Sequence, residues 1–139
     1  MLEGTFPKEI VEALPALFSL DLGKNLIEGS IIPDIANLSN LTNFVMEDNR
    51  LTGPLPFDLF YAENLQVFNV RDNLLTGQIP STISSLLNLN VLNFAGNELT
   101  GFIPNELGSL KNLVYLYLQT NEFRGTLPSS LGQLTSLSK

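Results

Sequence analysis

The sequence contains no cysteine and no histidine among its 139 residues. Without cysteine, disulfides, thiolate metal sites and thiol nucleophiles are excluded. Without histidine, Ser/His/Asp triads, histidine general bases and the common zinc sites are also excluded. The sequence therefore lacks most of the usual catalytic groups, and we expect a protein that is not an enzyme and that binds neither a cofactor nor a metal.

Long hydrophobic runs are absent as well. No segment approaches the roughly 20 apolar residues of a membrane-spanning helix, and the N-terminus lacks the basic and then apolar arrangement of a signal peptide. Hydrophobic residues nevertheless make up 44% of the chain and charged residues only 15%. This balance is unlike that of disordered chains and predicts one folded domain.

Basic residues are few. Seven Lys and Arg stand against fourteen Asp and Glu, which gives a net charge of −7. A field of this sign repels phosphate groups, so nucleic acid is not an expected partner. It attracts a cationic peptide or a basic patch on another protein.

What dominates the sequence is a repeat of 24 residues. Each unit has an asparagine, a glycine four residues later, an aliphatic residue at six, in most units a proline at seven, and further apolar residues at ten and sixteen. The recurring asparagines are Asn25, Asn49, Asn73, Asn97 and Asn121, and the glycines are Gly29, Gly53, Gly77, Gly101 and Gly125.

The repeat divides the chain into equal units within a single domain, 1–139. Residues 1–16 correspond to the second half of an earlier unit, with one extra residue, and residues 137–139 begin a further unit. The five complete repeats are 17–40, 41–64, 65–88, 89–112 and 113–136.

In each repeat, apolar residues alternate with others just before the asparagine, which predicts a short strand with one buried face. These strands are predicted at 20–22, 44–46, 68–70, 92–94 and 116–118. Stacked about 4.8 Å apart, they would form a parallel sheet. The asparagine amides would bond the backbone of the following turns as a ladder, and the glycine and proline mark an irregular second half of each repeat.

Three segments, 49–56, 73–80 and 97–104, read Asn-x-Leu-Thr-Gly-x-Leu/Ile-Pro. They resemble the plant-type leucine-rich repeat. The resemblance implies an α/β solenoid, a right-handed superhelix with a concave parallel β-sheet. It also implies a protein- or peptide-binding module from the extracellular domain of a plant receptor-like kinase or receptor-like protein. Such a module acts in signalling or defence, and a co-receptor is a further implied partner. Polygalacturonase-inhibiting proteins share these repeats, so a secreted inhibitor of a microbial cell-wall hydrolase is the alternative.

Ectodomains of this family usually have cysteine-containing caps, which this sequence lacks. We therefore expect a fragment of a longer parent protein that is located at the cell surface and anchored in the membrane. Ends without caps expose apolar core, so self-association is a further expectation.

The candidate binding surface consists of the strand residues that point outward on the concave sheet. Tyrosines two residues apart on the last strand are favoured anchors at interfaces, valines extend the apolar area, and polar residues beside them suit hydrogen bonding. Alternatively, these tyrosines and valines merely suit strands, or a missing repeat once covered them. The predicted partner-binding residues are Val67, Asn69, Arg71, Val91, Asn93, Tyr115, Tyr117 and Gln119.

A charged group formed by Glu47, Asp48, Arg71 and Asp72 either binds a basic ligand or pairs internally, Glu47 with Arg71 and Lys24 with Asp48. Internal pairing is the preferred interpretation. Calcium ligation lacks the necessary ligand spacing. A glycosidase-like pair of Asp21 and Glu47 would need an enclosed cleft, and the concave face is expected to be open.

Two tripeptides, Asn37-Leu-Ser and Asn40-Leu-Thr, match the N-glycosylation pattern. We predict Asn37 and Asn40 as glycosylation sites on a secreted parent. About two such tripeptides are expected by chance in this composition, so the pattern is compatible with secretion without establishing it.

Overall fold

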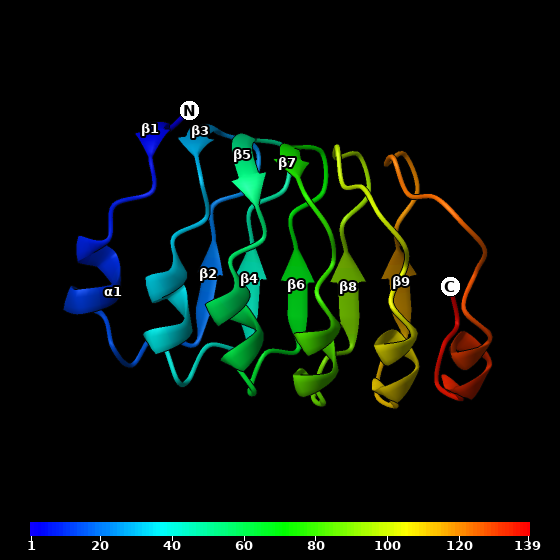
Figure 1. Cartoon of the computed structure of the whole chain (residues 1–139). Coiled ribbons are helices and arrows are strands. Elements are labelled where there is room, and N and C mark those ends of the chain that lie inside the picture. Colours follow the sequence, from blue (N-terminus) through cyan, green and yellow to red (C-terminus); the bar gives the residue numbers. More distant parts are fainter.

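Each repeat forms one coil of a solenoid in the computed structural model, which describes residues 1–139 (Figure 1). One strand per repeat contributes to a five-stranded parallel sheet of order β2-β4-β6-β8-β9, which lines the concave side. The predicted solenoid is confirmed, and the observed strands begin one residue earlier than predicted. They are β2 Ser19–Asp21, β4 Asn43–Val45, β6 Val67–Asn69, β8 Val91–Asn93 and β9 Tyr115–Tyr117.

A second parallel sheet lies along one edge of the solenoid, at the top of Figure 1. It occupies the half of the repeat that the sequence predicts to be irregular, and that prediction is wrong. Because consecutive coils are in register, their extended segments lie close enough to pair despite the glycine, whose φ is +76° at Gly53 within the sheet. Its strands, in the order β1-β3-β5-β7, are β1 Glu3–Thr5, β3 Leu26–Gly29, β5 Arg50–Pro54 and β7 Leu74–Thr76.

The convex side carries one short 3₁₀ helix per complete repeat. In four of them the repeat's proline stands directly before the first residue, with extended backbone and no N–H that would need a partner. None of the helices of the structure has the length and hydrophobicity needed to cross a bilayer. The 3₁₀ helices are η1 Pro33–Asn37, η2 Phe57–Tyr61, η3 Ser81–Ser85, η4 Asn105–Ser109 and η5 Ser129–Gln133.

The partial first repeat differs at this place. Its extra residue is absorbed by α1, an α-helical turn at Glu9–Ala13. An α-helical turn holds 3.6 residues against 3.0 in a 3₁₀ turn, so a change of helix type takes up additional chain. The strands that follow keep their register: Leu20 still lies opposite Phe44.

Between the concave sheet and the convex helices runs one hydrophobic core of 30 buried residues. A row of phenylalanines connects successive coils through edge contacts. Ring centroids are 5.8 Å apart for Phe44 and Phe68, 4.8 Å for Phe68 and Phe94, and 6.3 Å for Phe60 and Phe68. The first two contacts are T-shaped and the third is tilted. Aromatic contacts of this kind add to the burial of apolar area, so these rings hold the central coils together.

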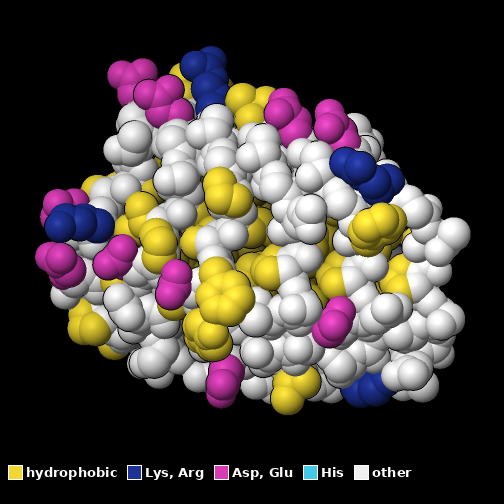
Figure 2. Space-filling view, viewed as in Figure 1, with side chains coloured by type: hydrophobic (Ala, Val, Ile, Leu, Met, Phe, Trp, Pro, Cys, Tyr) yellow, Lys and Arg dark blue, Asp and Glu magenta, His cyan; other side chains and the backbone are white.

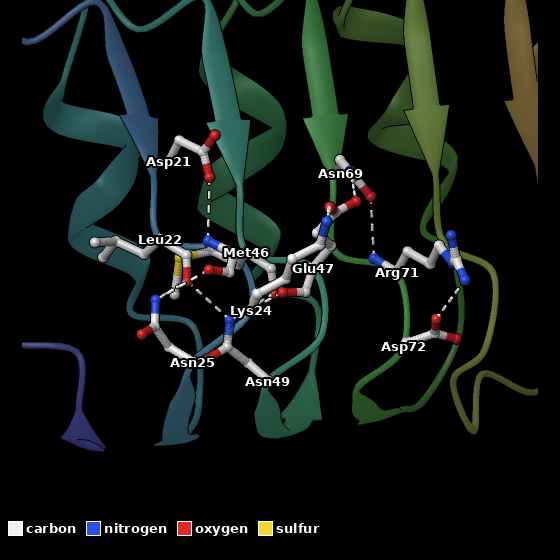
Figure 3. Close-up of polar contacts among 11 residues, drawn as sticks. Asp21, Leu22, Lys24, Asn25, Met46, Glu47, Asn49, Asn69, Arg71 and Asp72 are labelled. Atoms are coloured by element: carbon white, nitrogen blue, oxygen red, sulfur yellow. Dashed lines mark hydrogen bonds and ion pairs between the residues drawn. The ribbon is translucent and has the colours of Figure 1, made fainter. Parts of the chain in front are cut away.

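The recurring asparagines form a ladder at one end of the concave strands. The Nδ2 of Asn49 donates to Met46 O at 3.1 Å in its own repeat and to Leu22 O at 3.0 Å in the preceding one. Its Oδ1 accepts the N–H of Ile27 at 3.0 Å, also in the preceding repeat. Figure 3 shows the amides of Asn25 and Asn49 converging on the Leu22 carbonyl.

The same bonds recur at Asn73, Asn97 and Asn121. Asn73 and Asn97 are the two buried polar residues of the chain. One side chain therefore satisfies carbonyl groups of two coils and an N–H group that would otherwise be buried without a partner.

Replacing Asn73 with leucine tests this ladder. Leucine has a similar size, but it leaves the Leu51 N–H without a partner. It also removes one of the two amide donors from Met46 O and from Val70 O, which keep those of Asn49 and Asn97. We expect the free energy of unfolding to fall by roughly 1–3 kcal/mol, because the buried Leu51 N–H is left unpaired. Chemical denaturation would measure the loss. Asn43→Leu, a more exposed position on β4, is the control, and an Asn73→Leu midpoint equal to that of the parent would contradict the role of the ladder.

Candidate interaction surface

The outward residues of the concave sheet line up in columns because the strands pair in register. Val67 lies opposite Val91, which lies opposite Tyr115. Asn69, Asn93 and Tyr117 form the adjacent column in the same way. The alternate residues, such as Phe68 and Leu92, are fully buried. The fold thus brings these six predicted residues together on one surface.

Tyr115 and Tyr117 form an aromatic stack at the C-terminal end of this surface. Their ring planes are nearly parallel, at 5°, with centroids 6.4 Å apart, and Tyr115 is 42% exposed. Lys139 Nζ lies 5.5 Å from the centre of the Tyr117 ring, within the range of a cation–π contact. Sequence reasoning missed Lys139, although it stands 24 residues after Tyr115 and continues that column.

Next to the stack is a hollow of about 530 Å³, where the strands end and the ladder turns begin. Of the eight predicted residues, Arg71, Asn93, Tyr117 and Gln119 line it, whereas Val67, Asn69, Val91 and Tyr115 do not. Asp72 also lines the hollow, and the sequence placed it in the charged group considered for a basic ligand. The remaining lining residues, which are not among the eight predicted ones, are Ala95, Gly96, Thr120 and Lys139.

Three of these lining residues could have been found from their position in the repeat. Asp72, Gly96 and Thr120 directly precede the ladder asparagines, and in all three the backbone has positive φ, at 51°, 66° and 57°. A left-handed residue ends the strand and turns the chain toward the ladder. The hollow therefore lies along a row of sharp turns whose geometry the asparagines fix.

Two predicted polar residues bond within the protein. Asn69 donates to Glu47 Oε2 at 2.7 Å and accepts the Arg71 N–H at 3.2 Å (Figure 3). The Oδ1 of Asn93 accepts the Ala95 N–H at 3.2 Å. Such bonds stabilise the bend after each strand. Asn93 keeps its amide donor available for a ligand, whereas Asn69 mainly orients Glu47 and Arg71.

The charged residues pair internally, but the expected partners are wrong. Arg71 lies 2.8 Å from Asp72 Oδ2, and Lys24 Nζ lies 3.7 Å from Glu47 Oε1 (Figure 3). The sharp turn brings Asp72 back beside Arg71, so this arginine pairs along its own coil and not with Glu47 across the sheet. Both pairs are solvent-accessible, so each stabilises the fold only weakly.

Gly96 makes room for the Arg71–Asp72 pair. A Cβ at this position would lie 2.0 Å from Asp72 Oδ1 and 3.3 Å from Asp72 Cα. The equivalent position in the next repeat is Thr120, which already carries a side chain at φ 57°. A side chain is therefore accommodated in one coil and not in its neighbour.

Both predicted glycosylation sites lie away from the concave sheet. Asn37 is the last residue of η1, and Asn40 follows three residues later. The side chains of both are exposed. Neither belongs to the hollow beside the tyrosine stack.

Profiles of the leucine-rich repeat match the chain over residues 63–123 and 16–38, together more than half of its length. The chain belongs to the leucine-rich repeat family. No curated protein sequence gives a significant match.

Solved structures of plant receptors resemble the chain over nearly its whole length. The plant peptide hormone receptor RGFR1 in complex with RGF2 is 34% identical, with a TM-score of 0.95 over 99% of this chain and 22% of the receptor chain. The Arabidopsis receptor kinase HAESA, in complex with the peptide hormone IDA and the co-receptor SERK1, is 36% identical. Its TM-score is 0.94 over 98% of this chain and 22% of the HAESA chain. The chain thus spans about a fifth of these receptor chains.

The same scaffold also occurs in a protein with another role. A plant ice-binding protein is 29% identical, with a TM-score of 0.88 over 95% of this chain and 43% of that protein. The coil geometry alone therefore does not determine a function, which has to be inferred from the surface residues.

Gly96→Ala tests the turn beside the hollow. Alanine at positive φ is strained, and the added methyl displaces the Asp72 carboxylate from Arg71. We expect the variant to lose about 1–3 kcal/mol of unfolding free energy, measured by denaturant titration. The matched control is Thr120→Ala, which should change stability by less than about 0.5 kcal/mol. Equal stability of Gly96→Ala and the parent would show that the turn tolerates a side chain.

Proposed function

We propose that the chain is part of the extracellular ligand-binding domain of a plant receptor-like kinase or receptor-like protein, and that it binds a peptide on its concave sheet. The observation that carries the proposal is the stacked tyrosine pair beside a polar hollow, on a chain that is 34–36% identical to two hormone-receptor ectodomains. Neither feature suffices alone. Their combination supplies both a scaffold used for recognition and an anchoring site.

The stack provides the apolar part of the site. Two rings held parallel expose a broad face, and Val67 and Val91 continue it toward earlier coils. Rigid aromatic side chains lose little conformational entropy when a ligand packs on them. An apolar side chain of an extended peptide would rest here.

The hollow provides the polar part. Gln119 is exposed, and Asn93 keeps a free amide donor. Both can bond the backbone groups of an extended peptide, which otherwise lose water on binding. Asp72 offsets the charge of Arg71 within the hollow, so Lys139 supplies the positive charge that can accept an acidic ligand group at this end of the sheet.

The ends of the solenoid support a second interaction. An apolar hollow of about 260 Å³, lined partly by Leu2, Phe6, Ile10 and Leu22, opens beside the first coil. Self-association through such surfaces remains a prediction, as do a co-receptor partner and membrane anchorage of the parent. No observation favours the alternative of a secreted hydrolase inhibitor.

The double variant Tyr115→Ala/Tyr117→Ala tests the binding site. We expect it to fold normally and to bind a peptide more weakly by over about 1 kcal/mol, because anchoring aromatic residues carry much of the binding energy. The measurement is calorimetric titration of the full chain with a panel of synthetic plant peptide hormones. Tyr61→Ala on the convex side is the control. Equal affinities would place the interface elsewhere, and no binding by any peptide would count against the peptide-receptor proposal.

A further inference from the structure

A second hollow, of about 340 Å³, lies on the convex side between η1 and η2. These helices are the cyan and blue-green turns that stand side by side in Figure 1. Asn37, the asparagine of the first glycosylation tripeptide, lines the hollow together with Asp34, Asp58 and Tyr61. It lies on the opposite side of the solenoid from the tyrosine stack.

The hollow has an aromatic wall of fixed orientation. Tyr61 is 55% exposed, and its ring packs edge-to-face on Phe57, itself 50% exposed, with centroids 5.4 Å apart. Both rings are half-exposed, and Tyr61 shares the hollow with an asparagine that can be modified. In Figure 2, viewed from this side, hydrophobic side chains show at the surface among scattered acidic ones.

The polar walls are carboxylates without partners in the chain. Asp34 stands at the start of η1 and Asp58 at the start of η2, and neither forms an ion pair. An ionised carboxylate only accepts hydrogen bonds, so the hollow suits a ligand rich in hydroxyl and amide donors. A sugar ring combines such donors with apolar C–H faces that pack on an aromatic ring.

We propose that Asn37 carries an N-linked glycan whose first sugars rest in this hollow, against Tyr61 and within reach of Asp34 and Asp58. The proposal depends on the extracellular location proposed above. In the modification, Asn37 Nδ2 bonds to the anomeric carbon of an oligosaccharide carried on a polyprenyl diphosphate. The bond from that carbon to the diphosphate oxygen breaks, the diphosphate leaves with the electron pair, and the amide loses a proton.

The neighbouring Asn40 lacks such a surface. It occupies the repeat position at which Asn64, Asn88 and Asn112 donate to a carbonyl of the preceding coil, at 2.8–3.0 Å. The hydroxyl of Thr42, the third residue of its tripeptide, donates to Phe18 O at 2.9 Å. The folded chain therefore offers a seat for a glycan at Asn37 and not at Asn40.

A glycan seated here would cover the exposed Phe57–Tyr61 pair and keep the convex side from making other contacts. The concave surface would stay open. Glycosylation would thus favour one face of the solenoid for recognition.

Occupancy is tested by secreting the full chain from mammalian cells behind a supplied signal peptide, which makes the result independent of the native location. We expect glycopeptide mass spectrometry to find the glycan at Asn37, with the modification retained in Asn40→Gln and lost from the Asn37 site in Asn37→Gln. An unmodified Asn37 would overturn the proposal. Peptide binding by unglycosylated bacterial protein tests the receptor function separately.

The seat is tested by thermal unfolding of the secreted proteins. We expect Asn37→Gln to melt roughly 3 °C below the glycosylated parent, and the difference to vanish in a Tyr61→Ala background. The difference in melting temperature should persist in a Tyr61→Phe background, which keeps the ring. It should also persist in a Tyr115→Ala background, which changes the concave side. Unglycosylated parent and Asn37→Gln should melt together. A difference that persists in Tyr61→Ala would mean that the glycan does not rest on this ring.

Discussion

The structure depends on the ability of one asparagine amide to bond two coils at once. Nδ2 donates to carbonyls of its own repeat and of the preceding one, and Oδ1 accepts an N–H from the preceding repeat, as at Asn73. No apolar residue could satisfy these buried groups, and an aspartate would supply acceptors where donors are needed. The residue type is thus dictated by backbone groups that the turn leaves unpaired.

The proposed binding surface follows from this constraint. Because each strand ends at an equivalent asparagine, the strands stay in register, and residues 24 positions apart become neighbours on the sheet. The hollow forms where left-handed residues such as Asp72 and Thr120 turn the chain into the ladder. Variable side chains are therefore displayed at fixed spacing on a scaffold that they do not have to stabilise.

Sequence reasoning reached whatever the period determines. The coils, the facing columns and the asparagine positions all follow from counting residues, because equivalent positions have equivalent surroundings. It did not reach the second sheet, because Leu-Thr-Gly gives no alternation from which a strand could be predicted. It also mispaired Glu47 and Arg71, because side-chain partners depend on rotamers and on a turn that brings Asp72 back beside Arg71. The hollow needed coordinates, since it depends on the path of the chain through the left-handed turns at Asp72, Gly96 and Thr120.

The helix-type change in the first repeat shows where this architecture absorbs variation in length. One additional residue converts a 3₁₀ turn into α1 and leaves the pairing of β2 with β4 undisturbed. Insertions and deletions on the convex side are thereby separated mechanically from the proposed binding surface. A lineage of such proteins could accumulate small indels there while selection on the opposite face tuned recognition one side chain at a time.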